Sequence, residues 1–105
     1  DNIILIESNV TFLDGKNISH LFPVKINFNK NLKEGMKNND IIELQKFLNN
    51  NGYILNNSTY GSPGNETNHF GSYTKNALIK FQKDNNISPA SGYFGQITRE
   101  FINNL

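Results

Sequence analysis

The chain contains no cysteine, no tryptophan and only three prolines. The absence of cysteine excludes a disulfide scaffold, a cysteine-based zinc module and thiol catalysis. No apolar run approaches the roughly 20 residues that a membrane-spanning helix needs. The chain begins with Asp1 and has no signal peptide, so we expect a mature form or an excised piece of a longer protein. Its 105 residues suffice for one domain with a single core.

Charge is balanced, with ten basic and nine acidic residues and a net charge of +1. The two signs are interspersed, so no patch is basic enough to hold a phosphate backbone, and we expect no nucleic-acid partner. Asparagine accounts for twenty of the 105 residues, and lysine outnumbers arginine nine to one. We interpret this bias as the codon usage of an AT-rich genome rather than as a functional signature.

The first 30 residues have the pattern of short strands. Residues 2–6 and 9–13 are rich in β-branched side chains. Residues 21–28 alternate towards their end, with Ile26 and Phe28 on one face. We therefore expect two or three strands in this segment.

The period becomes helical from Asn39 onward. We expect Asn39 or Asp40 to cap this first helix, since Glu43 stands three residues after Asp40, at the spacing of a capping box. Gly52 should end the helix, because glycine tolerates the left-handed position that follows a helix C-terminus.

A long loop over residues 53–69 separates the first helix from two more, expected at about 72–84 and 95–104. The two later helices share the pattern Phe-Gly-x-x-Thr, in which glycine is expected to free the backbone for a sharp entry. Their apolar positions fall at i, i+3, i+4 and i+7, which predicts one buried stripe on each helix. The residues expected in the common core are Leu44, Leu48, Ala77, Leu78, Phe81, Phe101 and Ile102.

Four short motifs follow one another in a specific order and spacing. They are Leu44-Gln45, Phe70-Gly71-x-x-Thr74, Phe81-Gln82 and Phe94-Gly95-x-x-Thr98. Over about residues 32–105 this combination resembles the small three-helix peptidoglycan-binding domain family. The resemblance implies a mainly helical fold for residues 32–105. Residues 1–31, which we expect from their own pattern to form an N-terminal β-strand segment, lie outside the family's core. The resemblance also implies a noncatalytic module that binds peptidoglycan, through glycan strand or peptide stem, in a bacterial extracytoplasmic, secreted or surface protein.

Aromatic residues beside loops and the two Phe-Gly turns are the candidate binding features. Tyrosine offers apolar area and a hydrogen bond, and free N–H groups at helix starts suit the carboxylates of peptide stems. The residues predicted to contact the ligand are Tyr53, His69, Gly71, Tyr73, Tyr93, Gly95 and Gln96. We assign Gln45 and Gln82 instead to structural bonding of loop backbone from inside the domain, because buried polar groups must be satisfied.

Neither a metal nor a cofactor is expected. Glu66 is the only carboxylate in the segment Gly61–Thr67, whereas calcium sites gather several acidic oxygens. His20 and His69 have no partner at a short spacing, as a zinc site would require. No nucleophile motif is present, and no spacing pairs two carboxylates for glycoside cleavage, so we expect no enzyme.

Two alternatives remain open. In the first, the chain is a structural subunit or spacer of a bacterial surface assembly that makes protein–protein contacts. In the second, it is a targeting domain excised from a cell-wall hydrolase. The N-terminal strands would support the first alternative if they paired with a neighbouring chain's sheet in self-assembly.

Overall fold

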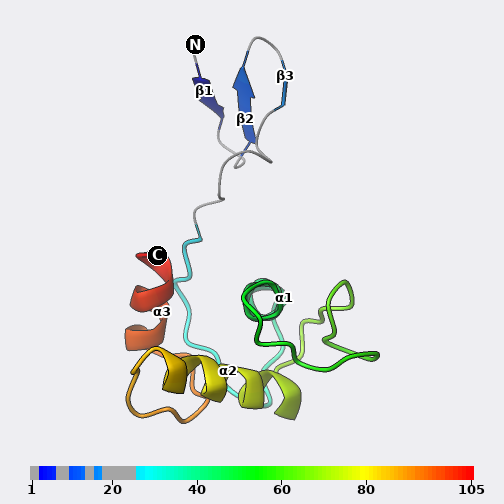
Figure 1. Ribbon diagram of the computed structural model, residues 1–105, viewed down its shortest axis with the longest axis vertical. Coiled ribbons are helices and arrows are strands. Elements are labelled where there is room, and N and C mark those ends of the chain that lie inside the picture. The colour runs from blue at the N-terminus through cyan, green and yellow to red at the C-terminus, as the bar shows by residue number, and fades with distance from the viewer. Residues whose placement is uncertain (1–2, 7–9, 14–15, 18–25) are drawn as a thin grey trace.

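The computed structural model describes residues 3–6, 10–13, 16–17 and 26–105, and for the strands only their backbone. Within these residues the protein is mainly helical, as expected, with three helices (Figure 1). The elements in chain order are β1 (Ile3–Ile6), β2 (Val10–Leu13), β3 (Lys16–Asn17), α1 (Asn39–Asn50), α2 (Ser72–Asp84) and α3 (Gln96–Asn103).

The three strands form one antiparallel sheet in the order β1-β2-β3. Ile3 lies opposite Leu13 in the pairing of β1 with β2, and Phe12 lies opposite Asn17 in the pairing of β2 with β3. The order leaves β1 at an edge of the sheet.

The prediction of a strand at 21–28 is wrong for residues 26–28, the part of this segment that the structure describes. Residues 21–25 lie outside the described part, and residues 26–28 belong to no strand. The Phe28 N–H donates to Asn103 Oδ1 at 2.7 Å, and Asn103 Nδ2 donates to the Phe28 carbonyl at 2.8 Å. A side-chain amide of α3 thus takes the place of a partner strand. The alternation persists as burial, because Phe28 is buried and Asn27 is exposed.

Residues 28–38, which we call the strap, then run past the entries of both later helices. Leu32 exchanges two backbone hydrogen bonds of 2.9 Å with Phe94. Further along, the Gly35 N–H donates to the Phe70 carbonyl at 2.8 Å, and the Phe70 N–H donates to the Met36 carbonyl at 2.9 Å. The strap therefore joins the two Phe-Gly turns to the start of α1.

Asn38, and neither Asn39 nor Asp40, is the N-cap of α1. Its backbone is extended, with φ −165°, and its side chain accepts a hydrogen bond of 2.8 Å from the Asp40 N–H. Asn39 is already the first helical residue. At the other end Gly52 adopts φ +89°, which confirms the expected glycine after the helix C-terminus.

Asparagine also ends each helix. The C-cap residues Asn51, Asn85 and Asn104 each donate from the side-chain amide to the carbonyl four residues earlier, at 2.7, 2.8 and 2.7 Å. Each of these carbonyls also accepts the backbone N–H of the same asparagine at 3.1 Å, so the side-chain amide adds a second hydrogen bond that reinforces the last turn of the helix. Part of the asparagine content thus has a structural use that the sequence analysis missed.

One hydrophobic core joins the helices, the strap and the long loop. The predicted core residues are all buried except Phe101, which is partly buried against the core. Phe28, Leu32, Phe70 and Phe94 join them from outside the helices. Phe81 is central, because its ring makes edge-on contacts with Phe47, Tyr53 and Phe101 at centroid distances of 5.4, 5.5 and 5.8 Å.

Replacing Phe81 by alanine should destabilise the domain by about 3–5 kcal/mol, because it removes three aromatic contacts and leaves a cavity. Urea unfolding followed by circular dichroism measures the change. Tyr60→Ala is the matched control, since Tyr60 is 83% exposed and its loss should stay within about 0.5 kcal/mol. A loss below about 1 kcal/mol for Phe81→Ala would show that Phe81 is not central.

Candidate functional site

The starts of α2 and α3 are two copies of one structure. Gly71 caps α2 with φ −104° and ψ −166°, and Gly95 caps α3 with φ −105° and ψ −166°. Neither start has a side-chain cap bond. Any residue can adopt these dihedral angles, so the expectation that glycine frees the backbone here is wrong.

Close packing explains why residue 95 is glycine, but it does not explain the glycine at position 71. A Cβ on Gly95 would lie 2.6 Å from Cε2 of the Tyr93 ring, whereas a Cβ on Gly71 would meet His69 Cε1 at an ordinary 3.4 Å. Gly95 therefore lets the Tyr93 ring lie against the entry to α3. At Gly71 no comparable contact excludes a side chain.

A buried glutamine amide holds each of these turns, as the sequence analysis predicted. Gln82 Nε2 donates to the Tyr93 carbonyl at 2.9 Å and to Thr98 Oγ1 at 3.1 Å, while its Oε1 accepts from the Gly92 N–H at 2.9 Å. Gln82 is 1% exposed. With two donors and one acceptor engaged, this amide has no free donor for a ligand.

Gln45 repeats the arrangement at the start of α2. Its Nε2 donates to the His69 carbonyl at 2.9 Å and to Thr74 Oγ1 at 3.0 Å, and its Oε1 accepts from the Thr67 N–H at 2.6 Å. Both threonine hydroxyls of the Phe-Gly-x-x-Thr pattern thus accept from a glutamine. This was a contact that the pattern alone did not predict.

The predicted site residues fall into three places. His69, Gly71 and Tyr73 lie at the start of α2, where the Tyr73 side chain is 54% exposed. Near them Lys75 Nζ lies 3.5 Å from Glu34 Oε1 of the strap. The first turn of α2 therefore carries one exposed tyrosine and one lysine that is ion-paired to the strap.

The second group is Tyr93, Gly95 and Gln96 at the start of α3. These three residues line one hollow of about 290 Å³. Tyr93 is 45% exposed, and Gln96 Nε2 donates to Glu100 Oε2 at 3.0 Å. The hollow also includes Ile97, which is 62% exposed and which the sequence analysis did not select. The sequence could have pointed to Ile97, because the two Phe-Gly-x-x-Thr patterns lie 24 residues apart and this repeat aligns Ile97 with the selected Tyr73.

Tyr53 lies apart from both helix starts. It follows α1, its ring packs against Phe81, and its hydroxyl donates to Asp84 Oδ2 at 2.9 Å. That hydrogen bond raises the pKa of the Tyr53 hydroxyl. Asp84 ends α2 at the opposite end from Tyr73, so Tyr53 lies apart from the candidates at the start of α2. It is also absent from the hollow that Tyr93, Gly95 and Gln96 line.

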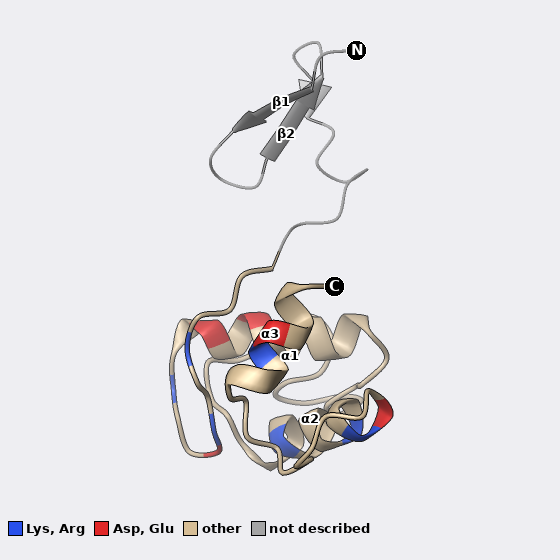
Figure 2. Cartoon of the chain, turned by 90° about the vertical axis from the view of Figure 1, so that its left-hand side faces the viewer, with Lys and Arg blue, Asp and Glu red and all other residues tan. Residues whose placement is uncertain are grey.

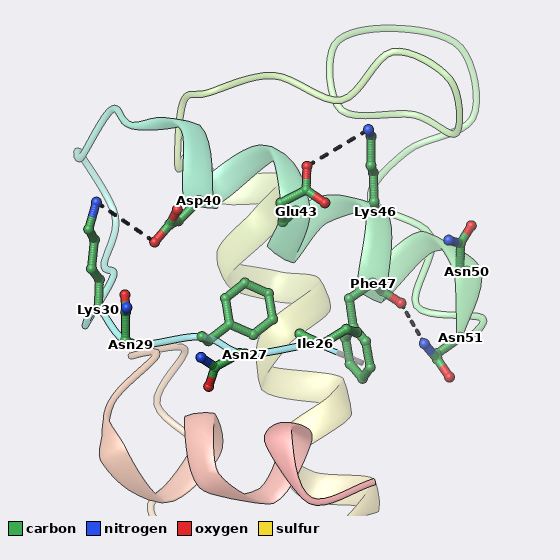
Figure 3. Close-up of a pocket in the computed structure, with 11 residues that line it drawn as sticks. Ile26, Asn27, Asn29, Lys30, Asp40, Glu43, Lys46, Phe47, Asn50 and Asn51 are labelled. Carbon is green, nitrogen blue, oxygen red and sulfur yellow. Dashed lines mark hydrogen bonds and ion pairs between the residues drawn. The ribbon is translucent and has the colours of Figure 1, made fainter. Parts of the chain in front are cut away.

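A hollow of about 820 Å³ lies between residues 26–30 and α1 and contains none of the predicted residues (Figure 3). Its charged side chains face one another. Lys30 Nζ lies 3.9 Å from Asp40 Oδ2, and Lys46 Nζ lies 3.9 Å from Glu43 Oε2. Elsewhere among the described residues, lysine and acidic side chains are likewise mixed over the helices and the strap (Figure 2).

Glu66 organises the long loop. Asn49 Nδ2 donates to Glu66 Oε2 at 2.8 Å, and the Gly64 N–H donates to the same carboxylate at 3.2 and 3.3 Å. Partial burial raises the pKa of Glu66, but these hydrogen bonds, with Lys46 nearby, outweigh burial and leave the pKa lower than usual. Glu66 thus holds the loop through hydrogen bonds to a helix side chain and to a loop amide.

Residues 3–6, 10–13, 16–17 and 26–105 contain no group of three or more His, Cys, Asp or Glu side chains placed to hold a metal ion. Over the same ranges, no helix has both the length and the apolar character needed to cross a membrane.

Three short helices, two of them entered through glutamine-anchored turns, define a small helical domain built on an internal repeat. Residues 37–102 match the family model described as a putative peptidoglycan binding domain, and the chain belongs to this family. The family assignment agrees with the resemblance carried by the sequence motifs. No curated protein and no solved structure matches the chain.

Gln82→Ala should cost about 3 kcal/mol or more, because it leaves the Gly92 N–H and the Thr98 hydroxyl without their partner, and each unsatisfied buried group costs about 1–3 kcal/mol. Urea unfolding measures the loss. Gln96→Ala is the control, because Gln96 is exposed and should matter by about 0.5 kcal/mol or less. Equal losses in the two variants would contradict the anchoring role.

Glu66 should make stability depend on pH. Because its folded pKa is depressed, the contribution is complete above the unfolded value of about 4.3 and is lost as the pH falls through the folded pKa. Wild type should therefore lose more stability than Glu66→Gln between about pH 7 and about pH 3. Urea midpoints across this range test the difference, and parallel curves for the two proteins would refute it.

Proposed function

We propose that this chain is a noncatalytic module that binds peptidoglycan for a bacterial envelope or secreted protein, outside the cytoplasm. Membership of the peptidoglycan-binding family supports the ligand class. The observation that carries the proposal is the pair of exposed tyrosines, Tyr73 and Tyr93, beside two helix starts without side-chain caps. Uncapped N–H groups attract anions, and tyrosine rings offer apolar area to sugars and peptides.

The noncatalytic role is supported by the state of the carboxylates. Glu66 is bonded within its loop, and Glu43 lies on the exposed side of α1 beside Lys46. Glycoside cleavage uses two carboxyl groups that flank one bond. The hydrogen bonds of Glu66 to Asn49 and Gly64 fit a structural carboxylate better than one of such a pair.

For the domain organisation we propose an N-terminal β segment followed by the helical domain, with the boundary moved from residue 32 to a point before Ile26. Ile26 packs against the helical core, and Phe28 belongs to it. The two hydrogen bonds between Phe28 and Asn103 support the same boundary.

A second candidate function is the structural subunit of a surface assembly. The feature that favours it is the sheet order, in which β1 is an edge strand that pairs, among the described strands, with β2 alone. Addition of a strand from another copy would then build the assembly.

Replacing both Tyr73 and Tyr93 by alanine should reduce the fraction of protein that sediments with insoluble peptidoglycan, because both exposed rings are lost. Tyr60→Ala is the control, since it removes an exposed tyrosine that belongs to the long loop and to neither helix start. Circular dichroism must first show that each variant folds.

Deletion of residues 1–22 belongs to the same test and should leave sedimentation largely intact. The opposite pattern, with binding lost on deletion and retained in the double variant, would favour the assembly function over the binding module.

A further inference from the structure

The outer side of α3 carries two hollows that meet. The hollow of about 290 Å³ described above and another of about 610 Å³ share Ile87, Ser88 and Ile97 in their walls. The larger one continues along α3 past Phe101. We call this surface, formed by Tyr93, Ile97 and Phe101 with the loop 85–91, the α3 face.

Apolar side chains form a stripe along the α3 face. Ile97 and Phe101 stand four residues apart on α3, which places their side chains on one side of the helix about 6 Å apart. Tyr93 precedes the helix and lines the same hollow as Ile97. Tyr93 and Ile97 are 45% and 62% exposed, while Phe101 is half-buried against Phe81. The stripe thus presents apolar area to solvent within hollows rather than on a convex surface.

The polar groups around this stripe are almost all uncharged. Residues 85–98 contain no lysine, arginine, aspartate or glutamate. The only charged side chain in the walls of the two hollows is Glu100, and it already accepts a hydrogen bond from Gln96. The other polar walls carry amide and hydroxyl groups, from Asn85, Asn86, Ser88, Ser91, Gln96 and Asn104.

We propose that the α3 face binds the glycan strand of peptidoglycan through its N-acetylated sugars, and not the peptide stem. The inference rests on the proposed function and assigns the part of the polymer that this surface recognises. Sugar rings combine apolar faces with neutral hydroxyl and acetamido groups, which match an apolar stripe bordered by amides and hydroxyls. A peptide stem carries carboxylates, and the only positive groups that the α3 face offers them are the uncapped N–H groups at the start of α3, because its walls contain no lysine or arginine side chain. The apolar stripe and the neutral amides and hydroxyls that make up the rest of the face match a sugar better than a charged stem.

The test uses the full chain and two soluble probes, a β-1,4-linked N-acetylglucosamine oligomer and a sugar-free stem peptide. In nuclear magnetic resonance titrations the oligomer should shift the backbone amide signals of Ser88, Gln96 and Ile97. The stem peptide should leave these three signals unchanged. Sedimentation of the same protein with insoluble peptidoglycan is measured in parallel.

Ile97→Asp should weaken binding of the oligomer about tenfold or more, because it replaces apolar contact area by a charge that the sugar cannot pair. The variant should fold, since an acidic residue in the first turn favours a helix. Ile54→Asp is the matched control, because Ile54 is 42% exposed and lies outside both hollows, and it should bind the oligomer like wild type.

Three results would overturn the inference: no response to the oligomer, an equal response of the α3 face to the stem peptide, or equal weakening by Ile97→Asp and Ile54→Asp. Sedimentation equilibrium adds a fourth, because a dimer that Ile97→Asp dissociates would show that a second copy covers the face. Binding to insoluble peptidoglycan without a response to the oligomer overturns this inference alone. Absence of binding to insoluble peptidoglycan overturns the proposed function.

Discussion

The buried amides of Gln45 and Gln82 are the constraint on which the rest of the domain depends. Each uses both its donors and its acceptor within the protein, and each joins its own helix to the turn that opens the next helix. An unsatisfied amide in the core would cost more than the net gain of an ordinary hydrogen bond. The two glutamines therefore fix where α2 and α3 begin, because a shift of either helix start would leave a buried amide without its hydrogen-bond partners.

The strap holds the same two turns through backbone hydrogen bonds. Its backbone pairs with Phe94 and Phe70 on the side of the turns that the glutamines do not occupy, and both phenylalanine rings are fully buried. Adjacent residues of an extended chain point to opposite sides. Burial of Phe94 therefore directs its neighbour Tyr93 outward, where the ring remains about half exposed. The exposed tyrosine is thus a consequence of how the core is closed.

Periodicity predicted the helices and their buried stripes well, because the spacing of apolar residues along a helix is a local property that the sequence alone contains. The N-cap of α1 was assigned to the wrong residue because Asn38, Asn39 and Asp40 are all good caps, and only the extended backbone of Asn38 distinguishes them. The strand expected to include Ile26 and Phe28 failed because pairing depends on a partner that a local pattern does not reveal. The hollows of the α3 face could not be predicted from the sequence for the same reason, because their walls come from both a loop and a helix.

The internal repeat separates what holds the fold from what the surface can recognise. Thr74 and Thr98 occupy equivalent positions and accept the same kind of hydrogen bond, so the anchor is common to both copies. Tyr73 and Ile97 are also equivalent, yet one presents a hydroxyl and the other only apolar atoms. Both are more than half exposed, so neither identity is dictated by the core. Substitutions at such positions cost little stability. We therefore propose that the specificity of this domain lies at its helix starts and not in its anchors.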